Sequence, residues 1–324
     1  MVKLDNIQKV LQSELSELNQ IIRNTLHTDN ELMDKIVTTY LQTKGKQIRP
    51  ILVLLSAKML GYINNHVLYA GAALEMLHNA SLIHDDIVDE TKIRRGIPTI
   101  NAIWDNHIAV LVGDFFVSNA LAAGLMTNNI SILSALSALG KELALGEIDQ
   151  ICNAREHILD EQRYFSVIKK KTASLFMDCV RMGAEAGNAP KEDIPAMVKY
   201  AELLGLCFQI KDDIFDYYDN PQIGKPTGND LREGKITLPL IYALNNSNAD
   251  DAEEMRQLIK NDNLSESDIN CLIEFAKREG GIDYAYASMQ KMQSEAESII
   301  SEYPNSEAKT AFQEIFDFII RRDK

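Results

Sequence analysis

Hydrophobic residues recur at steps of three and four along most of the chain, which is the spacing of an amphipathic helix. The first segment with this pattern covers residues 4–24. The same pattern predicts further helices over residues 31–41, 51–60, 66–92, 101–124, 129–151, 160–186, 193–218, 235–245, 251–260, 266–278, 281–301 and 306–321. Residues 66–92 are apolar nearly all round, so we expect this helix to lie in the core.

Turn signals separate these segments, and no stretch shows the alternation typical of a strand. With 8 Pro and 16 Gly among 324 residues, the composition also favours long helices over a turn-rich sheet protein. No linker rich in Pro, Gly or Ser divides the chain. We therefore expect one all-α domain over residues 1–324, a helical bundle whose core can hold a site.

Charge and cysteine usage narrow the classes of partner. The net charge of −14 opposes nucleic acid binding, so an anionic substrate would need local Lys or Arg and a bridging cation. The four cysteines form no CxxC pair, which fits reduced thiols in the cytoplasm. Without an apolar signal core or a run of about 18 apolar residues, we expect no membrane span. Peripheral membrane association stays open.

Two acidic clusters interrupt apolar helical segments. Residues 85–89 and residues 212–216 both read DDxxD. On a helix, the first and last aspartate share one face, about 6 Å apart along the axis. Like charges at this spacing repel, and Mg²⁺ prefers carboxylate oxygens. One such cluster could be a solvated helix end, but two favour a magnesium site. An EF-hand is excluded because Tyr217 stands where its loop needs Gly.

Cationic residues lie near breaks between the predicted helices. They are Lys46, Arg49, Arg94, Arg95, Lys171, Lys225 and Lys235. Arg and Lys bind phosphate oxygens, although any single one is more often simply solvent-exposed. His78 lies two helical turns before Asp85, and Gln209 one turn before Asp213. Each could equally be a buried, hydrogen-bonded core residue.

Taken together, these residues resemble the trans-prenyl diphosphate synthases, the polyprenyl synthetase family. The resemblance covers about residues 40–240. Its motifs occur in the family's order: residues 45–50 (GKQIRP), the first DDxxD, residues 94–96 (RRG), residues 113–115 (GDF), residues 171–172 (KT), the second DDxxD and residues 224–225 (GK). The resemblance implies the isoprenoid synthase fold, with long helices around a central elongated cavity, and a homodimer.

The resemblance also implies roles for single residues. Those acting in catalysis would be Asp85, Asp86, Asp89, Arg94, Lys171, Thr172, Gln209, Asp212, Asp213, Asp216, Lys225 and Lys235. Mg²⁺ would bind Asp85, Asp89 and Asp212, with the other three aspartates in support. The allylic diphosphate would contact Arg94, Lys171, Lys225 and Lys235, and isopentenyl diphosphate Lys46, Arg49, His78 and Arg95. Thr172 and Gln209 would line the site of positive charge.

The implied reaction fits these residue types. Ionisation of the allylic C–O bond leaves negative charge on diphosphate, which metal ions and fixed cations stabilise. The isopentenyl double bond then attacks the allylic cation and a proton is lost. In the family the departing diphosphate is thought to be the base, so the lack of a Ser/His/Asp or Cys/His motif is no obstacle.

Product length depends on the helix that carries the first motif. By the resemblance, the growing chain passes Ser81, Ala80 and Leu77. Short-chain relatives carry bulky aromatics near the first two positions, whereas this chain has small residues there. We expect a long all-trans product, octaprenyl diphosphate as the best single prediction, made from farnesyl or geranyl diphosphate. A farnesyl- or geranylgeranyl-length product is the alternative, and a terpene cyclase or a regulatory subunit are weaker ones.

Overall fold

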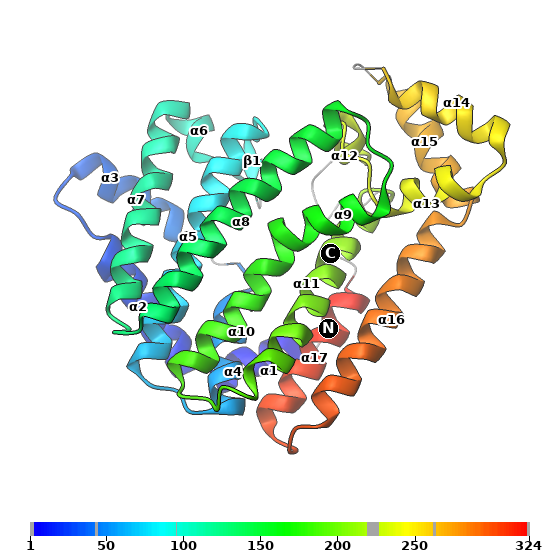
Figure 1. Cartoon of the computed structure of the whole chain (residues 1–324). Helices are drawn as coiled ribbons and strands as arrows, with labels where there is room; N and C mark the ends of the chain where they lie inside the picture. Colours follow the sequence, from blue (N-terminus) through cyan, green and yellow to red (C-terminus); the bar gives the residue numbers. More distant parts are fainter. Residues whose placement is uncertain (1–2, 43–44, 95, 219–226, 262–263, 323–324) are drawn as a thin grey trace. The chain divides into compact units, whose positions relative to one another are not determined.

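The computed structural model describes residues 3–42, 45–94, 96–218, 227–261 and 264–322, and these are almost entirely helical (Figure 1). The helices are α1 (Lys3–Val10), α2 (Gln12–Leu26), α3 (Glu31–Leu41), α4 (Ile48–Leu60), α5 (Asn65–Val88), α6 (Ile100–Ile103), α7 (Asn106–Leu125), α8 (Ile130–Arg155), α9 (Glu161–Ile168), a π-helical turn η1 (Lys169–Ala173), α10 (Ser174–Ala186), α11 (Ile194–Phe215), α12 (Asn229–Arg232), α13 (Leu238–Asn246), α14 (Ala249–Ile259), α15 (Glu266–Arg278), α16 (Gly281–Ser301) and α17 (Glu307–Arg321). The predicted all-α class is confirmed.

Contacts between residues divide the chain into two compact units. Unit 1 comprises Met1–Lys141, Leu175–Ala201 and Glu302–Ile315. Unit 2 comprises Glu142–Ser174, Glu202–Ser301 and Phe316–Lys324. The first acidic motif therefore belongs to unit 1 and the second to unit 2. The expectation of one domain stays a prediction.

Helix α5 forms the centre of unit 1. It packs against α2, α4 and α7, and its buried residues follow one another along nearly its whole length, as its apolar sequence predicts. Phe116 of α7 is fully buried and meets the ring of Tyr40 edge-on, with the ring centroids 5.5 Å apart. The hydroxyl of Tyr40 donates to Asn79 of α5 (3.2 Å). The helix that bears the first motif is thus fixed on several sides.

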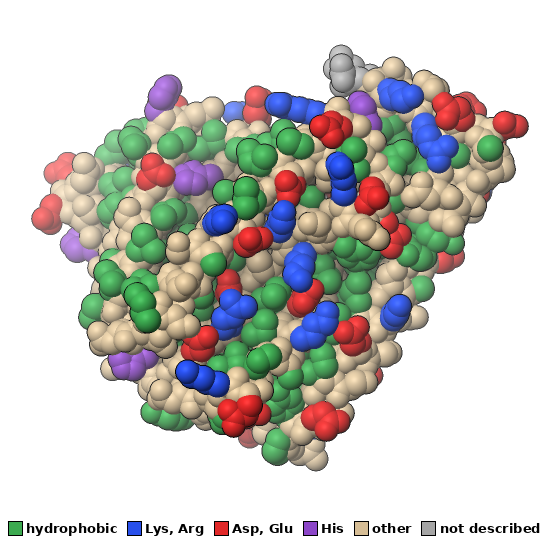
Figure 2. Space-filling model, in the orientation of Figure 1, with side chains coloured by type: hydrophobic (Ala, Val, Ile, Leu, Met, Phe, Trp, Pro, Cys, Tyr) green, Lys and Arg blue, Asp and Glu red, His purple; other side chains and the backbone are tan. Residues whose placement is uncertain are grey.

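Helix α7 is apolar on both its faces. Its inward face is buried, and its outward face exposes Val110, Leu111, Leu121 and Leu125. Figure 2 shows hydrophobic side chains at the surface in the region of α7. By length and composition α7 could cross a membrane, with a mean hydropathy of 1.8, although buried core helices meet the same criterion. No membrane span was predicted here, because the sequence contains no run of about 18 apolar residues. The absence of a membrane span therefore stays a prediction.

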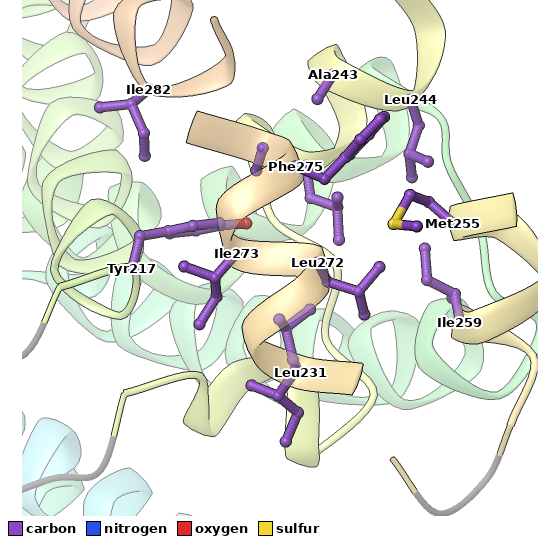
Figure 3. Close-up of a cluster of buried hydrophobic side chains, with 13 residues drawn as sticks. Tyr217, Leu231, Ala243, Leu244, Met255, Ile259, Leu272, Ile273, Phe275 and Ile282 are labelled. Atoms are coloured by element: carbon purple, nitrogen blue, oxygen red, sulfur yellow. The ribbon is translucent and has the colours of Figure 1, made fainter. Parts of the chain in front are cut away.

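Unit 2 has a separate apolar core, formed by α13 to α16 with contributions from α12 and from Tyr217, which follows α11. Figure 3 shows Leu272 and Ile273 of α15 among Leu231 of α12 and Met255 and Ile259 of α14. All five are buried. The amphipathic pattern of these short helices is satisfied within unit 2, which provides a fixed support for α11.

Several predicted helices are interrupted in the structure. The segment 4–24 breaks at Leu11, and the segment 101–124 breaks before Asp105, whose carboxylate accepts the N–H of Ile108 (2.9 Å) as the N-cap of α7. The segment 160–186 contains the π-helical turn η1. Hydrophobic spacing did not reveal these breaks, because the apolar residues continue through them.

A two-residue hairpin, β1 (Ile93–Arg94) paired with β2 (Ile97–Pro98), follows the first acidic motif. The sequence analysis predicted no strand, since strands of this length carry no alternation. Gly96 has a φ of 78° in the turn, a conformation that favours glycine. The hairpin reverses the chain directly after α5.

Close packing of α4 against α10 generates a testable prediction. A Cβ on Gly183 would lie 2.2 Å from the Val53 carbonyl oxygen and 2.2 Å from the Ser56 hydroxyl oxygen. Gly183→Ala should therefore lower the free energy of unfolding by about 2 kcal/mol, because the two helices must separate. Urea denaturation would measure this.

Gly140 of α8 offers the matched control, since a Cβ there would meet nothing within 4 Å. Gly140→Ala should leave stability unchanged or raise it by up to about 1 kcal/mol through helix propensity. Equal effects of the two substitutions would contradict the close contact as the cause.

Candidate active site

The first motif lies at the end of α5. Asp85 and Asp86 belong to the helix, and Asp89 is its C-cap, with its N–H donating to the Asp85 carbonyl (2.8 Å). Asp86 is only 5% exposed, whereas Asp85 and Asp89 are partly exposed. The two aspartates that the sequence analysis assigns to metal are therefore the two that solvent reaches.

Arg94 forms an ion pair with Asp86, the buried aspartate of this motif. Its Nε donates to Asp86 Oδ1 at 2.7 Å, and the β1–β2 hairpin brings it into reach. Asn101 adds a hydrogen bond to the Asp86 carbonyl (3.1 Å). In this structure, Arg94 therefore compensates a buried carboxylate, and its contact with diphosphate stays a prediction. Arg95 lies outside the described residues.

The second motif, at the end of α11, also has one buried aspartate and two that are partly exposed. Asp213 is 4% exposed. Its two oxygens accept hydrogen bonds from the Tyr164 hydroxyl (2.5 Å) and the Gln209 amide (2.8 Å). Thr172 in turn donates to Gln209 (2.7 Å). Burial raises the pKa of Asp213, and the hydrogen bonds from Tyr164 and Gln209 oppose that rise. Thr172 and Gln209, both predicted from sequence, thus belong to the hydrogen-bond network of the Asp213 carboxylate.

The other two aspartates of the second motif have different partners. The Asp216 carboxylate accepts the backbone N–H groups of Asn229 (2.9 Å) and Asp230 (3.0 Å), at the start of α12. The Asp212 side chain is 41% exposed and pairs with Arg322, whose Nη2 lies 2.6 Å from its Oδ1. Asp216 therefore joins two segments of unit 2, and solvent reaches Asp212.

A cavity of about 160 Å³ opens within unit 2 beside Asp213. Its polar lining comes from Gln150, Asn153, Asp160, Tyr164, Lys171, Thr172, Gln209, Asp213, Asp230, Lys235 and Thr237. Apolar residues, among them Val167, Ile168 and Ile241, complete it. The structure thus brings together Lys171, Thr172, Gln209, Asp213 and Lys235, as the sequence analysis expected of one site.

Lys171 and Lys235 each have an acidic partner in unit 2. Lys171 lies in η1, where the π-helical turn shifts the register of the helix, and pairs with Glu147 of α8. Lys235 pairs with Glu233. Both lysines are therefore held at the cavity by ion pairs. Lys225 lies outside the described residues.

The residues predicted for a second diphosphate belong to unit 1. Lys46 is exposed just before α4, and Arg49 lies in the first turn of α4 with its guanidinium over the Phe176 ring (5.6 Å). His78 of α5 is buried. Unit 1 therefore contains these three residues and the first motif, while their roles stay predictions.

The residues predicted to set product length lie on α5, N-terminal to the first motif. Leu77 and Ala80 are buried, and Ser81 donates to the His78 carbonyl (2.9 Å). The Ser81 hydroxyl is thus satisfied within its own helix. Ala80 and Ser81 therefore place little side-chain bulk on this part of α5.

The donor set fits a hard divalent cation. The accessible groups are carboxylates, which supply the oxygen ligands that Mg²⁺ takes. Arg94 and Arg322 each pair with one carboxylate of a motif. Within the described part of the chain, no three carboxylate, imidazole or thiol side chains already form a metal site. Convergence of the two motifs on one diphosphate stays a prediction.

Sequence reasoning missed several residues at these motifs. Tyr164, Glu147, Asp230 and Arg322 all contact or adjoin predicted site residues. Tyr164 could have been suspected from its position two turns before Lys171. Arg322 is separated from Asp212 by 110 residues, and no local pattern connects them.

Comparisons with known proteins show the family of the chain. A model of the polyprenyl synthetase family matches residues 30–276. The chain is 34% identical to octaprenyl diphosphate synthase of Haemophilus influenzae over 312 residues, covering 96% of this chain and 94% of the relative.

Solved structures show the same fold over the whole length. A geranylgeranyl pyrophosphate synthase from Bacteroides thetaiotaomicron is 36% identical, with a TM-score of 0.84, and each chain is covered to 98%. A polyprenyl synthase from Caulobacter crescentus, complexed with calcium and isoprenyl diphosphate, is 29% identical with a TM-score of 0.91, covering 99% and 98%. Since the family model and these relatives span nearly all of the helices described above, the chain belongs to the polyprenyl synthetase family and is a prenyltransferase.

Proposed function

We propose that this trans-prenyl diphosphate synthase joins isopentenyl diphosphate to farnesyl or geranyl diphosphate and releases a long all-trans product, octaprenyl diphosphate as the best single candidate. The proposed product length rests on two small residues, Ala80 and Ser81, on the helix that leads away from Asp85. The similarity to an octaprenyl diphosphate synthase supports it. A geranylgeranyl product is the second candidate, favoured by the similarity to a synthase of that product.

We further propose Mg²⁺ as the metal, held by Asp85, Asp89 and Asp212, where it would stabilise the charge that develops on the leaving diphosphate. The chain's own residues prepare that site. Asp86 and Asp213 are turned inward and compensated by Arg94 and by neutral donors. This fixes the helix ends, so that the outward carboxylates keep one geometry.

The cavity in unit 2 suits the allylic diphosphate. Lys171 and Lys235 supply cationic groups there. Thr172 and Gln209, joined by a hydrogen bond, would place their oxygen atoms toward the developing positive charge. The apolar part of the lining would limit the access of water, which could otherwise capture an allylic cation.

A second copy of the chain is the proposed partner. The outward face of α7 exposes Val110, Leu111, Leu121 and Leu125. Asp114 lies between them with its side chain 63% exposed. A charge in the middle of this face is costly in lipid and tolerable at a protein interface. We therefore infer that α7 faces a second copy.

Activity tests the function directly. Purified protein with Mg²⁺, farnesyl diphosphate and labelled isopentenyl diphosphate should form long-chain products, and EDTA should abolish them. Asp85→Asn should lower kcat about 10²- to 10³-fold, as expected when one group stabilising the leaving charge is lost. Steady-state kinetics would measure this.

Glu90→Gln is the matched control, because Glu90 is exposed and directly follows the motif. It should keep kcat close to that of the unmodified protein. If no allylic primer were extended, a regulatory subunit would explain the chain better. Cyclised products from one diphosphate would indicate a terpene cyclase.

Ala80→Phe tests the route of the growing chain. A ring at this buried position should close the space beside α5 and shift the products to shorter lengths, with little change in the first condensation. Chromatographic sizing of the products would show this. Ser81→Ala keeps the side chain small and should leave the distribution unchanged. An unaltered distribution in the phenylalanine variant would contradict this route.

The proposed dimer has its own test. Leu121→Glu combined with Leu125→Glu places two charges on the outward face of α7 and should convert dimers to monomers at micromolar concentration. Light scattering after size-exclusion chromatography would give the mass. Leu32→Glu alters an exposed leucine of α3 and should leave the mass unchanged. A monomeric unmodified protein would refute the interface.

A further inference from the structure

Arg322, directly after α17, is fixed on the second acidic motif. Its Nη2 donates both to Asp212 Oδ1 (2.6 Å) and to the carbonyl oxygen of Phe208 (2.9 Å). The Arg322 side chain is 7% exposed, while that of Asp212 is 41% exposed. Both residues belong to unit 2. A nearly desolvated cation therefore lies against a carboxylate that solvent can still reach.

Aromatic rings of α11 hold the guanidinium in place. Its central carbon lies 4.1 Å from the ring centroid of Phe208 and 5.5 Å from that of Phe215. Such contacts are attractive for Arg because its planar group is weakly hydrated. Helix α11 thus provides two rings, a carbonyl and a carboxylate for one side chain. This is a built site for Arg322, unlike an incidental surface ion pair.

The partner of Asp212 differs in kind from those of its neighbours. Asp213 accepts hydrogen bonds from neutral groups, the Tyr164 hydroxyl and the Gln209 amide. Asp216 accepts backbone N–H groups. Arg322 brings a full positive charge to the aspartate that would bind metal. A divalent cation at Asp212 must either displace this charge or lie a few ångströms from it, and both cost free energy.

We propose that Arg322 is a competing counter-ion that weakens divalent-cation binding at the second motif until a diphosphate adds negative charge. The proposal rests on the proposed function, because it takes the metal and the diphosphate from that function. Without diphosphate, the Arg322–Asp212 pair is nearly neutral, so a divalent cation gains little electrostatic free energy by binding there. With diphosphate, the added anionic oxygens attract the divalent cation strongly enough to overcome Arg322. Metal loading at Asp212 then follows the substrate.

Manganese binding without activity provides the test. Mn²⁺ would be titrated into the full chain and followed by electron paramagnetic resonance, with and without inorganic pyrophosphate. Arg322→Gln should tighten Mn²⁺ binding about tenfold in the absence of pyrophosphate, because a charge close to the ion is removed. With pyrophosphate present, the difference should shrink to about twofold or less. Asp212→Asn should abolish the effect of Arg322→Gln.

Arg321→Gln is the matched control, since it removes the same charge from an exposed position one residue earlier. It should leave Mn²⁺ affinity unchanged. The proposal is overturned if both variants shift the affinity equally, or if Arg322→Gln leaves it unchanged or weakens it. Because Asp212 is partly exposed, losing Arg322 does not strand a buried carboxylate. Arg322→Met, which keeps the stem against Phe208, replaces the glutamine variant if thermal unfolding shows that one to be damaged.

The two proposals fail in different ways. If the unmodified protein forms no polyprenyl product, the proposed function is wrong whatever Mn²⁺ does. If it forms product while the Arg322 and Arg321 variants bind Mn²⁺ alike, only the counter-ion role of Arg322 is wrong.

Discussion

Repulsion among adjacent carboxylates is the constraint on which the site depends. Each DDxxD motif places two neighbouring aspartates near the end of an apolar helix, and only one of the two side chains faces solvent. The structure resolves this in the same way twice. Asp86 and Asp213 turn inward, with 5% and 4% exposure, and receive donors from the protein. A buried carboxylate without such donors would cost several kcal/mol. Asp85, Asp89 and Asp212 stay partly exposed to solvent.

The irregular parts of the fold supply these donors. The β1–β2 hairpin returns Arg94 to Asp86, the short helix α12 directs two N–H groups at Asp216, and the turn η1 presents Thr172 to Gln209. These elements interrupt an otherwise regular helical chain at the places where a motif needs a partner. The long helices provide rigidity, and the interruptions determine which side chain meets which carboxylate.

The cations near the two motifs are each paired with a nearby carboxylate. The chain carries a net charge of −14, yet four basic side chains are held at the motifs and at the cavity of unit 2. Lys171 and Lys235 are each held by one acidic residue, and Arg94 and Arg322 each by one aspartate of a motif. At distances of a few ångströms, fixed pairs outweigh the mean field of the surface, which salt screens. These four pairs are neutral, while Asp213 and Asp216 receive hydrogen bonds from neutral donors, so the motifs keep negative charge.

The sequence by itself determined the helical class, because apolar residues at steps of three and four define a buried face. The register of DDxxD also placed its first and last aspartates on one helical face, whereas the choice of Asp85, Asp89 and Asp212 as metal ligands came from the resemblance. Only the tertiary structure decided the partners. Tyr164 reaches Asp213 across 49 residues and Arg322 reaches Asp212 across 110. The break at Leu11 likewise left no mark on the apolar spacing. Contacts between residues so far apart in the sequence depend on how whole helices pack. The spacing of apolar residues within one helix contains no information about that packing.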